Sequence, residues 1–559
     1  MAAVILTGRR TGTAKTAEPG FAGRATVDSL LRRAADIRPD IGALADASNR
    51  TALIGGEPRR LDWASLDRAV DVLAARFQAL GFPLDSVIAT QFPLCTDAVV
   101  GFLAIARAGL ISAPIPLGWG RRETVAHLQR VGARGILTCG RAGPLECADM
   151  MRFAAAETFS VRFVMSIGGP SLDGVVSLDD IFDHDGPADR IEITRPGNPA
   201  DHVVMVTAET AADGLYPVPR SHNELIAGGL GAFMAGVPDE TSVLAASLAP
   251  DSFAAIALQI VPWLMSGGRL IVHPPLAPRV LADDLGPAGV THVILPVAAG
   301  AIILRPAPEN RPVLRHLTLL ARRGDELGLA LALRPEGVAV DSFLAIGEAA
   351  LTRIVPGGGG AAIPLGPDTF ATGAGQAPIL VETRVTAGGT LAVKGAMVPS
   401  AAFPPGAERD VPPVWLVDAQ GYFDTQLPVS VDKATKTLSV SGRTAGVVSV
   451  GGRRLAERDI KQAYQDAGGD IAPVIKDDAV LGQRVSGVIG DGRAIVGLAL
   501  RLEATGLTPL GIPGAARQGT RVPFEDTRPK EPESPRDALA ETQATLEQLL
   551  TMARTAIAR

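Results

Sequence analysis

The stretch 206–225, VTAETAADGLYPVPRSHNEL, has the outline of a phosphate-binding loop. The hydroxyls of Thr207 and Thr210 could donate hydrogen bonds to a phosphate, and Gly214 closes the same segment. Glu209 would bring a carboxylate to that place, and a like-charge contact at about 4 Å costs several kcal/mol at an intermediate dielectric. Two interpretations stay open, a phosphate site and a simple surface turn from Thr207 to Gly214.

Helical and strand-like segments alternate around this stretch. Residues 61–81 place apolar side chains at helical spacing and end at Gly81, a residue typical of helix C-termini. We expect a buried strand at 86–90, a helix at 96–108 and a strand at 109–115, with further strand–helix units to about residue 350. This order predicts an α/β fold with layered sheets and helices on both faces.

Shifts in composition divide the chain into five parts. We expect a flexible tail at 1–25, a large multi-lobed N-terminal domain at 26–442 and a small α+β C-terminal domain at 443–505, with a helix at 456–467. Residues 506–535 are rich in proline and glycine, which predicts a linker. Residues 536–559 carry the apolar stripe of a closing helix.

The composition excludes several classes of protein. Hydrophobic residues make up 47% and charged residues 20%, which is typical of a globular chain. A net charge of -6 favours neither nucleic-acid nor membrane-surface binding. Cys95, Cys139 and Cys147 form no CxxC pair, so we expect no disulfide framework or zinc site, and a cytoplasmic location. The apolar runs 253–265 and 293–304 are too short to span a bilayer.

Motifs from about Val27 to Gly490 resemble those of the adenylate-forming superfamily, which includes acyl-CoA synthetases, aryl-acid ligases, nonribosomal adenylation domains and luciferases. The segment PRSHNEL resembles the end of the family's phosphate loop and tilts the likeness toward aryl-acid ligases. PWLMSGGRLIV resembles its L-x-x-G-x-x-V-V segment, and GTLAVKGAMV its G-E-L-x-V-R-G segment. GYFDTQLPVSVDKATKTLSVSGRTAGVVSVGGRRL resembles the family's long motif from G-W-F-x-T-G-D-L to G-G-E. The order and spacing of these pieces carry the resemblance.

The resemblance implies an activity and its cofactors. Such enzymes join a carboxylate to ATP, release pyrophosphate and pass the acyl group to a thiol. ATP and Mg²⁺ would be the cofactors, CoA or a carrier-protein thiol the acceptor, and a small carboxylic acid or acyl thioester the ligand. Because the reactants are anions, loop N–H groups, a lysine and a metal hold the phosphates.

Several parts of the family's nucleotide site are altered in this sequence. Glu209 stands at or beside the first loop glycine, and Tyr216 stands where the loop lysine would be. Leu344 replaces the aromatic residue that packs on adenine. Leu427 replaces the Asp that accepts hydrogen bonds from the ribose, a loss of roughly 1.5–3 kcal/mol. The motif of the catalytic lysine is missing, and Lys530, in a charged Pro-rich stretch, is its weak substitute.

Two other positions keep the family's residue type. Glu348, in FLAIGEAAL, matches the family's metal-holding Glu, so the resemblance makes it a candidate catalytic and Mg²⁺-binding residue. Taken alone, Glu348 would be a solvated helix residue. Arg443 matches the family's second ribose contact, or it caps or bridges the domain junction.

Three residues fall where the family binds its acyl substrate. Asp251, in SLAPDSFAAIA, could orient a hydroxyl, amine or amide of a ligand, but the favoured role is to cap a helix starting at Ser252. Arg322 and Arg323 could hold a carboxylate or phosphate in a fork geometry, or be solvated.

The family also rotates its small domain about a residue two positions past the ribose-binding Arg. Ala445 takes that position and Gly446 follows it. Because glycine absorbs backbone rotation readily, the sequence retains a candidate hinge at these two residues.

Together these features predict an acyl-CoA-synthetase-like protein with a degenerate ATP site. It would bind an acyl or aryl ligand in the inherited pocket, or a partner enzyme or carrier protein on its surface. Two alternatives stay open: an active AMP-forming ligase for an aryl or fatty acid, and a structural subunit of a complex. No nucleic-acid partner and no membrane span are expected.

Overall fold

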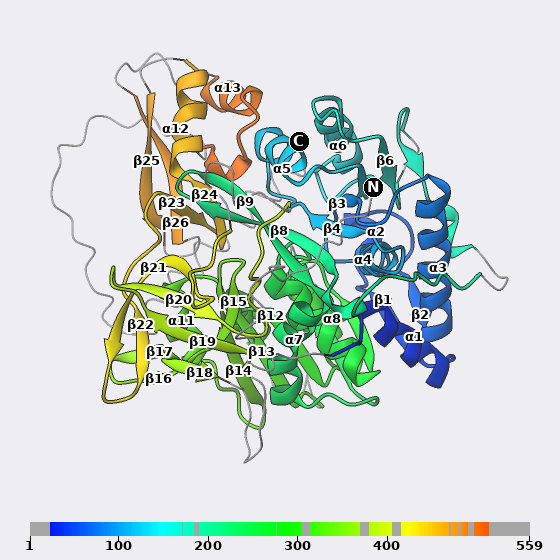
Figure 1. Cartoon of the computed structure of the whole chain (residues 1–559), viewed down its shortest axis with the longest axis horizontal. Coiled ribbons are helices and arrows are strands. Elements are labelled where there is room, and N and C mark those ends of the chain that lie inside the picture. The colour runs from blue at the N-terminus through cyan, green and yellow to red at the C-terminus, as the bar shows by residue number, and fades with distance from the viewer. Residues whose placement is uncertain are drawn as a thin grey trace. The chain divides into compact units, whose positions relative to one another are not determined.

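The computed structural model describes residues 23–169, 172–183, 189–275, 277–304, 313–368, 379–404, 415–468, 471–478, 482–489 and 497–513 (Figure 1). The chain forms two compact units, Met1–Ala445 and Gly446–Arg559. Helices and strands alternate through most of the first unit, which confirms the predicted α/β class. Lys530, the helix expected at 536–559 and most of the expected tail lie outside the described residues.

A seven-stranded sheet in the first unit has the order β7-β6-β5-β3-β4-β8-β9. Its strands are β3 (Val87–Gln91), β4 (Ile111–Pro114), β5 (Gly135–Thr138), β6 (Phe163–Ser166), β7 (Val176–Ser177), β8 (Val203–Ala211) and β9 (Gly214–Ser221). All neighbours are parallel except β9, which pairs antiparallel with β8 at one edge. The expected strands at 86–90 and 109–115 correspond to β3 and β4.

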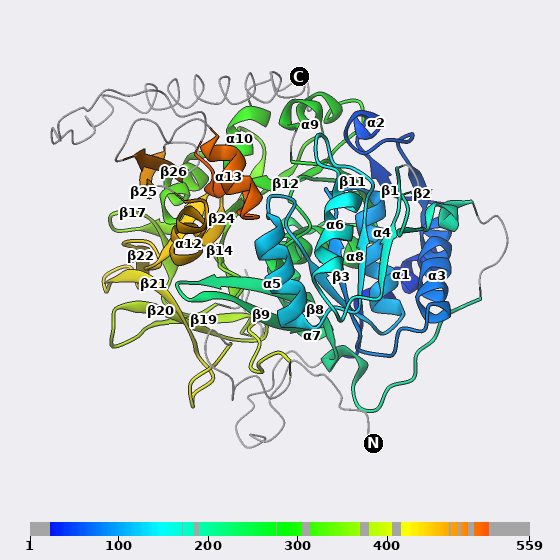
Figure 2. The same ribbon diagram turned by 90° about the horizontal axis from the view of Figure 1, so that it is seen from above.

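Helices cover both faces of this sheet (Figure 2). Two hydrophobic cores lie on the two faces of the sheet. α4 (Thr96–Arg107) is buried on every side and packs in the first core, whereas α5 (Arg121–Val131) and α6 (Cys147–Ala156) pack in the second. Side chains alternate across a strand, so Ile88 belongs to the first core, and its neighbours Val87 and Ala89 belong to the second.

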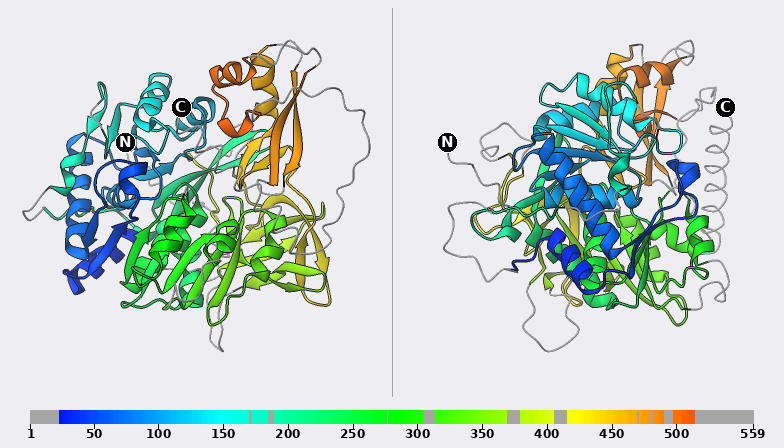
Figure 3. Two further views of the ribbon diagram at one scale, coloured as in Figure 1. Left: turned by 180° about the vertical axis from the view of Figure 1, so that it is seen from behind. Right: turned by 90° about the vertical axis from the view of Figure 1, so that its right-hand side faces the viewer.

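An eight-stranded sheet follows with the order β15-β14-β13-β12-β10-β11-β1-β2, seen from behind in Figure 3. Its parallel strands are β1 (Gly42–Asp46), β10 (Val243–Ala246), β11 (Arg269–Val272), β12 (His292–Pro296), β13 (His316–Ala321) and β14 (Ala339–Ile346). β2 (Arg60–Asp62) and β15 (Ala350–Arg353) are its antiparallel edges.

The helices of this layer are α1 (Val27–Ile37), α2 (Arg50–Leu53), α3 (Trp63–Ala79), α7 (His222–Gly236), α8 (Phe253–Ser266), α9 (Pro278–Asp284), α10 (Val297–Ile303) and α11 (Leu327–Ala332). α7 and α8 pack closely because α7 carries glycines at the contact: a Cβ on Gly228 would lie 2.4 Å from Phe253. The helix expected at 61–81 is α3, which begins two residues later because Asp62 caps it.

A third sheet completes the first unit with seven antiparallel strands in the order β16-β17-β22-β21-β20-β19-β18. They are β16 (Val355–Gly357), β17 (Gly360–Pro364), β18 (Gly366–Asp368), β19 (Val381–Val385), β20 (Thr390–Lys394), β21 (Phe423–Asp432) and β22 (Thr437–Val440). No helix in the described part of the chain is long and apolar enough to cross a bilayer.

The second unit is built on a four-stranded antiparallel sheet, β24-β23-β26-β25. It contains β23 (Val447–Val450), β24 (Arg453–Ala456), α12 (Glu457–Asp466), β25 (Ile471–Asp478), β26 (Gly482–Ile489) and α13 (Leu498–Ala504). α12 corresponds to the helix expected at 456–467. The start of the stretch expected to be a linker, 506–513, packs in this core instead: Leu507 is buried, and the Tyr464 hydroxyl donates to the Gly511 carbonyl at 3.3 Å.

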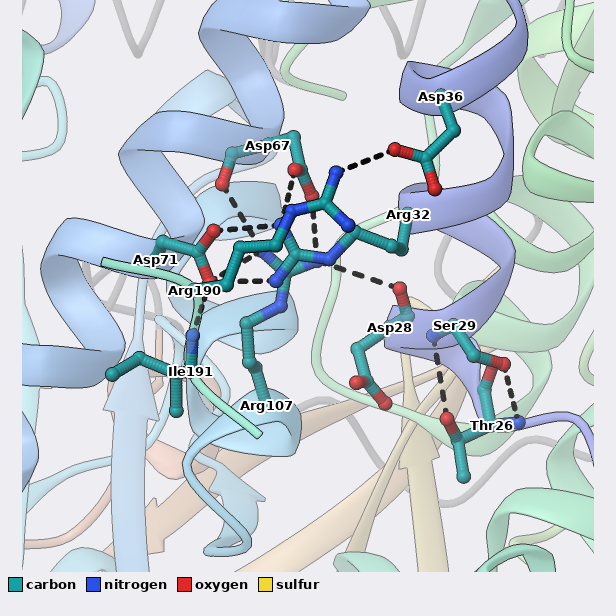
Figure 4. Close-up of polar contacts among 10 residues, drawn as sticks. All are labelled: Thr26, Asp28, Ser29, Arg32, Asp36, Asp67, Asp71, Arg107, Arg190 and Ile191. Carbon is teal, nitrogen blue, oxygen red and sulfur yellow. Dashed lines mark hydrogen bonds and ion pairs between the residues drawn. The ribbon is translucent and has the colours of Figure 1, made fainter. Parts of the chain in front are cut away.

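An ion-pair network ties α1, α3 and α4 together in the first unit (Figure 4). The guanidinium of Arg32 contacts both Asp67 and Asp71 of α3, and pairs bidentately with Asp71 at 2.7 and 2.8 Å. Arg107, the last residue of α4, lies 2.7 Å from Asp67 and 3.1 Å from Asp71. Asp71 also accepts from the Ile191 N–H at 3.2 Å. Every charge in this buried group has at least one opposite charge as a partner.

We predict that Arg107→Met lowers the free energy of unfolding by about 3 kcal/mol, because it leaves two buried aspartates short of a counter-charge. Urea unfolding measures this loss. The matched control is Arg190→Met, which removes the exposed pair with Asp36 at the rim of the same network. That control should change stability by less than about 1 kcal/mol, and equal effects of the two variants would contradict the buried-network account.

Candidate functional site

The stretch expected to be a phosphate loop or a surface turn is a closed β-hairpin. β8 and β9 pair without a break from Met205–Arg220 to Ala211–Gly214, and only Ala212 and Asp213 form the turn. Gly214 follows the turn with a φ of 130°, a value that favours glycine. In such a ladder the strands use their own N–H and carbonyl groups to bond each other. The surface-turn expectation is therefore wrong for Thr207, Glu209 and Thr210, which are buried.

The carboxylate of Glu209 folds back into the protein as an internal anion. One oxygen accepts from the N–H of Thr210 at 3.0 Å, and the other accepts from the N–H of Glu348 at 2.5 Å. Glu209 is only 4% exposed. Its two oxygens thus take up backbone donors of the kind that an anionic ligand would use.

Glu348 lies in the tight connection between β14 and β15, directly beside Glu209. Its carboxylate accepts from the N–H of Phe253, the first residue of α8, at 2.8 Å. Burial raises the pKa of Glu348 to about 7, and the nearby Glu209 charge adds to this, although Phe253, Arg322 and Arg220 oppose it. At neutral pH both the charged and the neutral form of this side chain are therefore populated.

Arg220 of β9 fastens the connection that carries Glu348. Its guanidinium, fully buried, donates to the carbonyls of Glu348, Ala349 and Met397; the bond to Ala349 is 2.8 Å long. The same group lies over the Phe253 ring at 3.4 Å. Burial lowers the pKa of Arg220 to about 10, so it stays charged at neutral pH. Arg220 therefore links three segments of the chain that are distant in sequence.

The Ser-His pair that follows Arg220 has structural roles. Ser221 caps α7: its hydroxyl accepts from the Glu224 N–H at 3.2 Å, and the Glu224 carboxylate accepts from the Ser221 N–H at 2.7 Å. The ring of His222 accepts from the Val27 N–H at 3.1 Å, which fixes the start of α1. Burial lowers the pKa of His222 to about 4, so the ring is neutral.

Asp251 is not the helix cap that was expected. α8 begins at Phe253, and the hydroxyl of Ser252 accepts from the Ala255 N–H at 3.3 Å. A serine hydroxyl one residue before the helix reaches this donor, so the cap belongs to Ser252. Asp251 instead lines a pocket together with Pro250 and Ile256.

The two neighbouring arginines point to different partners. Arg322 donates to the Ser252 hydroxyl at 2.8 Å, beside the start of α8. Arg323 lies 2.9 Å from Asp325 and 3.2 Å from Glu326, both in its own turn. The structure brings Arg322 to Glu348 and leaves Arg323 with local carboxylates, so the two do not form one fork.

Comparison with known proteins identifies the fold that carries this geometry. Residues 42–207 match the family model described as AMP-binding enzyme. The apo structure of MbtA from Mycobacterium smegmatis is 17% identical, with a TM-score of 0.60, over 88% of this chain and 91% of that chain. The chain has the adenylate-forming fold.

Two further solved structures share this fold. The o-succinylbenzoate CoA synthetase MenE from Bacillus subtilis, bound to a product analogue, is 13% identical, with a TM-score of 0.64, over 87% of this chain and 93% of that chain. NpsA-ThdA from Klebsiella oxytoca, an artificially fused adenylation–PCP di-domain, is 16% identical, with a TM-score of 0.62, over 87% and 92%. No curated protein sequence matches the chain.

Three residues that the sequence resemblance placed at nucleotide contacts, Tyr216, Leu344 and Leu427, pack in the protein interior. Tyr216 lies 6.4 Å from Trp415 and 6.5 Å from Phe423, whose rings stack on each other at 3.7 Å. Leu344 is buried in β14, and Leu427 packs against the same core. All three side chains therefore have packing roles in this structure.

The remaining expected site residues lie at the boundary between the two units. Arg443 is exposed, at the end of the first unit. Ala445 and Gly446 are the last residue of the first unit and the first of the second, and Gly446 has a φ of 68°. Among the residues with described side chains, no cluster of three or more His, Cys, Asp or Glu surrounds a metal-sized space.

Sequence reasoning gave no role to Arg220, although it lies within a quoted motif. Its acceptors are carbonyls on distant segments, which only the folded chain brings together.

We predict that Glu348 makes stability fall as pH rises. The native pKa of about 7 lies above the ordinary value of 4.5, so the native state binds this proton more tightly than the unfolded chain does. The contribution, at most about 3 kcal/mol, is complete below pH 4.5 and is lost as pH rises through about 7. Urea unfolding gives the free energy of unfolding at pH 5 and at pH 8. Between these two pH values, this free energy should fall by about 2 kcal/mol more in the wild type than in Glu348→Gln.

The control for this experiment is Glu336→Gln, which changes an exposed carboxylate. It should keep the wild-type pH dependence. The account fails if Glu348→Gln keeps that dependence as well.

Proposed function

We propose that this protein is a catalytically degenerate member of the adenylate-forming superfamily that binds an acyl or aryl ligand, or a partner protein, without forming an acyl adenylate. The observation that carries the proposal is the position of Glu209. Its carboxylate occupies the N–H groups of Thr210 and Glu348, within a hairpin whose strands are already paired.

Electrostatics makes this arrangement unfavourable for a triphosphate. A phosphate close to Glu209 would meet a like charge. The backbone N–H groups of Thr210 and Glu348 would also have to release the Glu209 carboxylate before they could bind the phosphate. The loop lysine position holds Tyr216, which packs in an aromatic cluster and offers no cation. Free loop N–H groups and a lysine, two of the family's means of holding phosphates, are therefore not offered by β8 and β9.

The residues present also fit magnesium poorly. Both oxygens of Glu209 and one oxygen of Glu348 already accept backbone N–H bonds. A carboxyl whose pKa is raised to about 7 is a weak ligand for a hard cation at neutral pH. These two side chains therefore brace the connection after β14 instead of holding a metal.

Other features support binding roles that do not need adenylation. The division of the chain at Ala445 and Gly446 supports a retained hinge between the two units. The Klebsiella structure joins an adenylation domain to a PCP, which makes a carrier protein a candidate partner here. Cys95, Cys139 and Cys147 are buried and free, which supports a cytoplasmic location.

The decisive experiment is titration of the full chain with Mg-ATP by calorimetry, with pyrophosphate release assayed in the same sample over a panel of aryl and fatty acids. We expect millimolar or weaker binding and no release with any acid. Micromolar binding together with release would overturn the proposal and make this an AMP-forming ligase.

Two variants and one assay separate the alternatives. An active ligase would lose turnover in Glu348→Gln and in Thr210→Ala, because both residues would then contact the nucleotide. A structural subunit would bind none of the acids or thioesters and would co-purify in a stable complex. A degenerate ligand-binding protein would bind an acyl or aryl compound without consuming ATP.

A further inference from the structure

Three large apolar side chains stand in solvent around one ion pair in the first unit. The Arg38 guanidinium lies 3.2 Å from the Glu240 carboxylate and also donates to the Glu240 carbonyl at 3.2 Å. Ile37 directly precedes Arg38, and the N–H of Ile41 donates to the Arg38 carbonyl at 3.3 Å. Val237 lies three positions before Glu240. We call these five residues the apolar patch.

The apolar residues of the patch are unusually exposed. The exposed fractions are 63% for Ile37, 51% for Ile41 and 71% for Val237. Single exposed apolar residues are common on protein surfaces, but a group of them marks an interaction surface. Burial of these three side chains against another apolar surface would be favourable, because it removes their area from water.

Val237 also has a backbone conformation that its side chain disfavours. α7 ends at Gly236, and Val237 follows as the C-cap with a φ of 44° and a ψ of 48°, in the left-handed region. Glycine or asparagine normally fills this position, because a β-branched side chain crowds the backbone there. Among the non-glycine residues of the described chain that have a positive φ, Val237 is the only β-branched one.

A single chain gains little from the side chain of Val237. Its conformation lowers stability, and a largely exposed side chain recovers little of that loss by packing. Strained residues of this kind cluster at sites that have a function. Val237 therefore fits a surface whose apolar groups become buried in a complex.

The charges of the patch select the partner. The side chains of Arg38 and Glu240 are 31% and 52% exposed, so each can reach an opposite charge on another molecule. A partner that carries charge of one sign would repel one of the two. A second copy related by a two-fold axis instead places Arg38 of each copy against Glu240 of the other, while the apolar residues meet. The patch is thus complementary to itself.

We propose that the apolar patch is the contact surface of a homodimer with two-fold symmetry, in which Arg38 and Glu240 pair between the two copies. Stable interfaces cover about 800 Å² on each partner, and the patch supplies only the centre of such an area. We therefore expect a weak dimer that forms as the protein concentration rises. The dimer goes beyond the proposed function, since it requires neither a nucleotide nor an acyl ligand.

Sedimentation equilibrium of the full chain from about 1 to 200 µM tests the dimer. The average mass should rise from 57.7 kDa at the dilute end toward that of two copies. Val237→Asn removes the apolar side chain and suits the left-handed conformation, so it should weaken the dimer at least about ten-fold. Thermal unfolding of the dilute protein should show no loss of stability in this variant, because its backbone strain is relieved.

The matched control is Val431→Asn, which changes a valine of β21 that is 42% exposed. It should leave the dependence of mass on concentration unchanged. If Val237→Asn does not fold, Ile37→Ser replaces it, and this variant should weaken the dimer as well.

A charge exchange tests the symmetry of the contact. Arg38→Glu and Glu240→Arg should each weaken the dimer, because like charges then face each other across the axis. An equimolar mixture of the two variants should associate again, since each charged contact between the copies then joins opposite charges. A wild type that stays at 57.7 kDa or a mass that rises beyond two copies would overturn the inference. A dimer that the apolar variant leaves unchanged, or a mixture as weak as its components, would overturn it as well.

Discussion

The continuous pairing of β8 with β9 is the constraint on which the candidate site depends. Because the two strands run together to a turn of only Ala212 and Asp213, Glu209 points into the protein at the height of Glu348. The same pairing places Arg220 on β9, from where it reaches the carbonyls around Glu348 and Met397. An open, glycine-rich loop would fix none of these side chains, so closing the hairpin and losing the phosphate contacts are one structural change.

Internal hydrogen bonds also occupy the polar groups around Glu348. The Glu348 carboxylate accepts from the start of α8, and Arg322 reaches the Ser252 hydroxyl beside it. Leu344 and Tyr216 fill space in the core.

Local signals explain what could be predicted and what could not. Helical spacing at 61–81 and 96–108 identified α3 and α4, because apolar periodicity depends only on near neighbours. Glu209 and Glu348 could be named from motifs, but their contact through a backbone N–H arises only when β8 meets the end of β14. The expected cap at Asp251 was wrong because the next hydroxyl, Ser252, competes for the same donors. Arg220 was missed because its partners are carbonyls, which carry no sequence signature.

The closed hairpin is tested most directly by amide hydrogen exchange over residues 206–216. The account predicts slow exchange at the alternate amides that bond across β8 and β9, faster exchange at the turn residues Ala212 and Asp213, and no change when Mg-ATP is added, because the ladder already occupies those donors. Rapid exchange along the whole stretch that becomes slow with Mg-ATP would show an open loop that closes on phosphate, and would contradict the account.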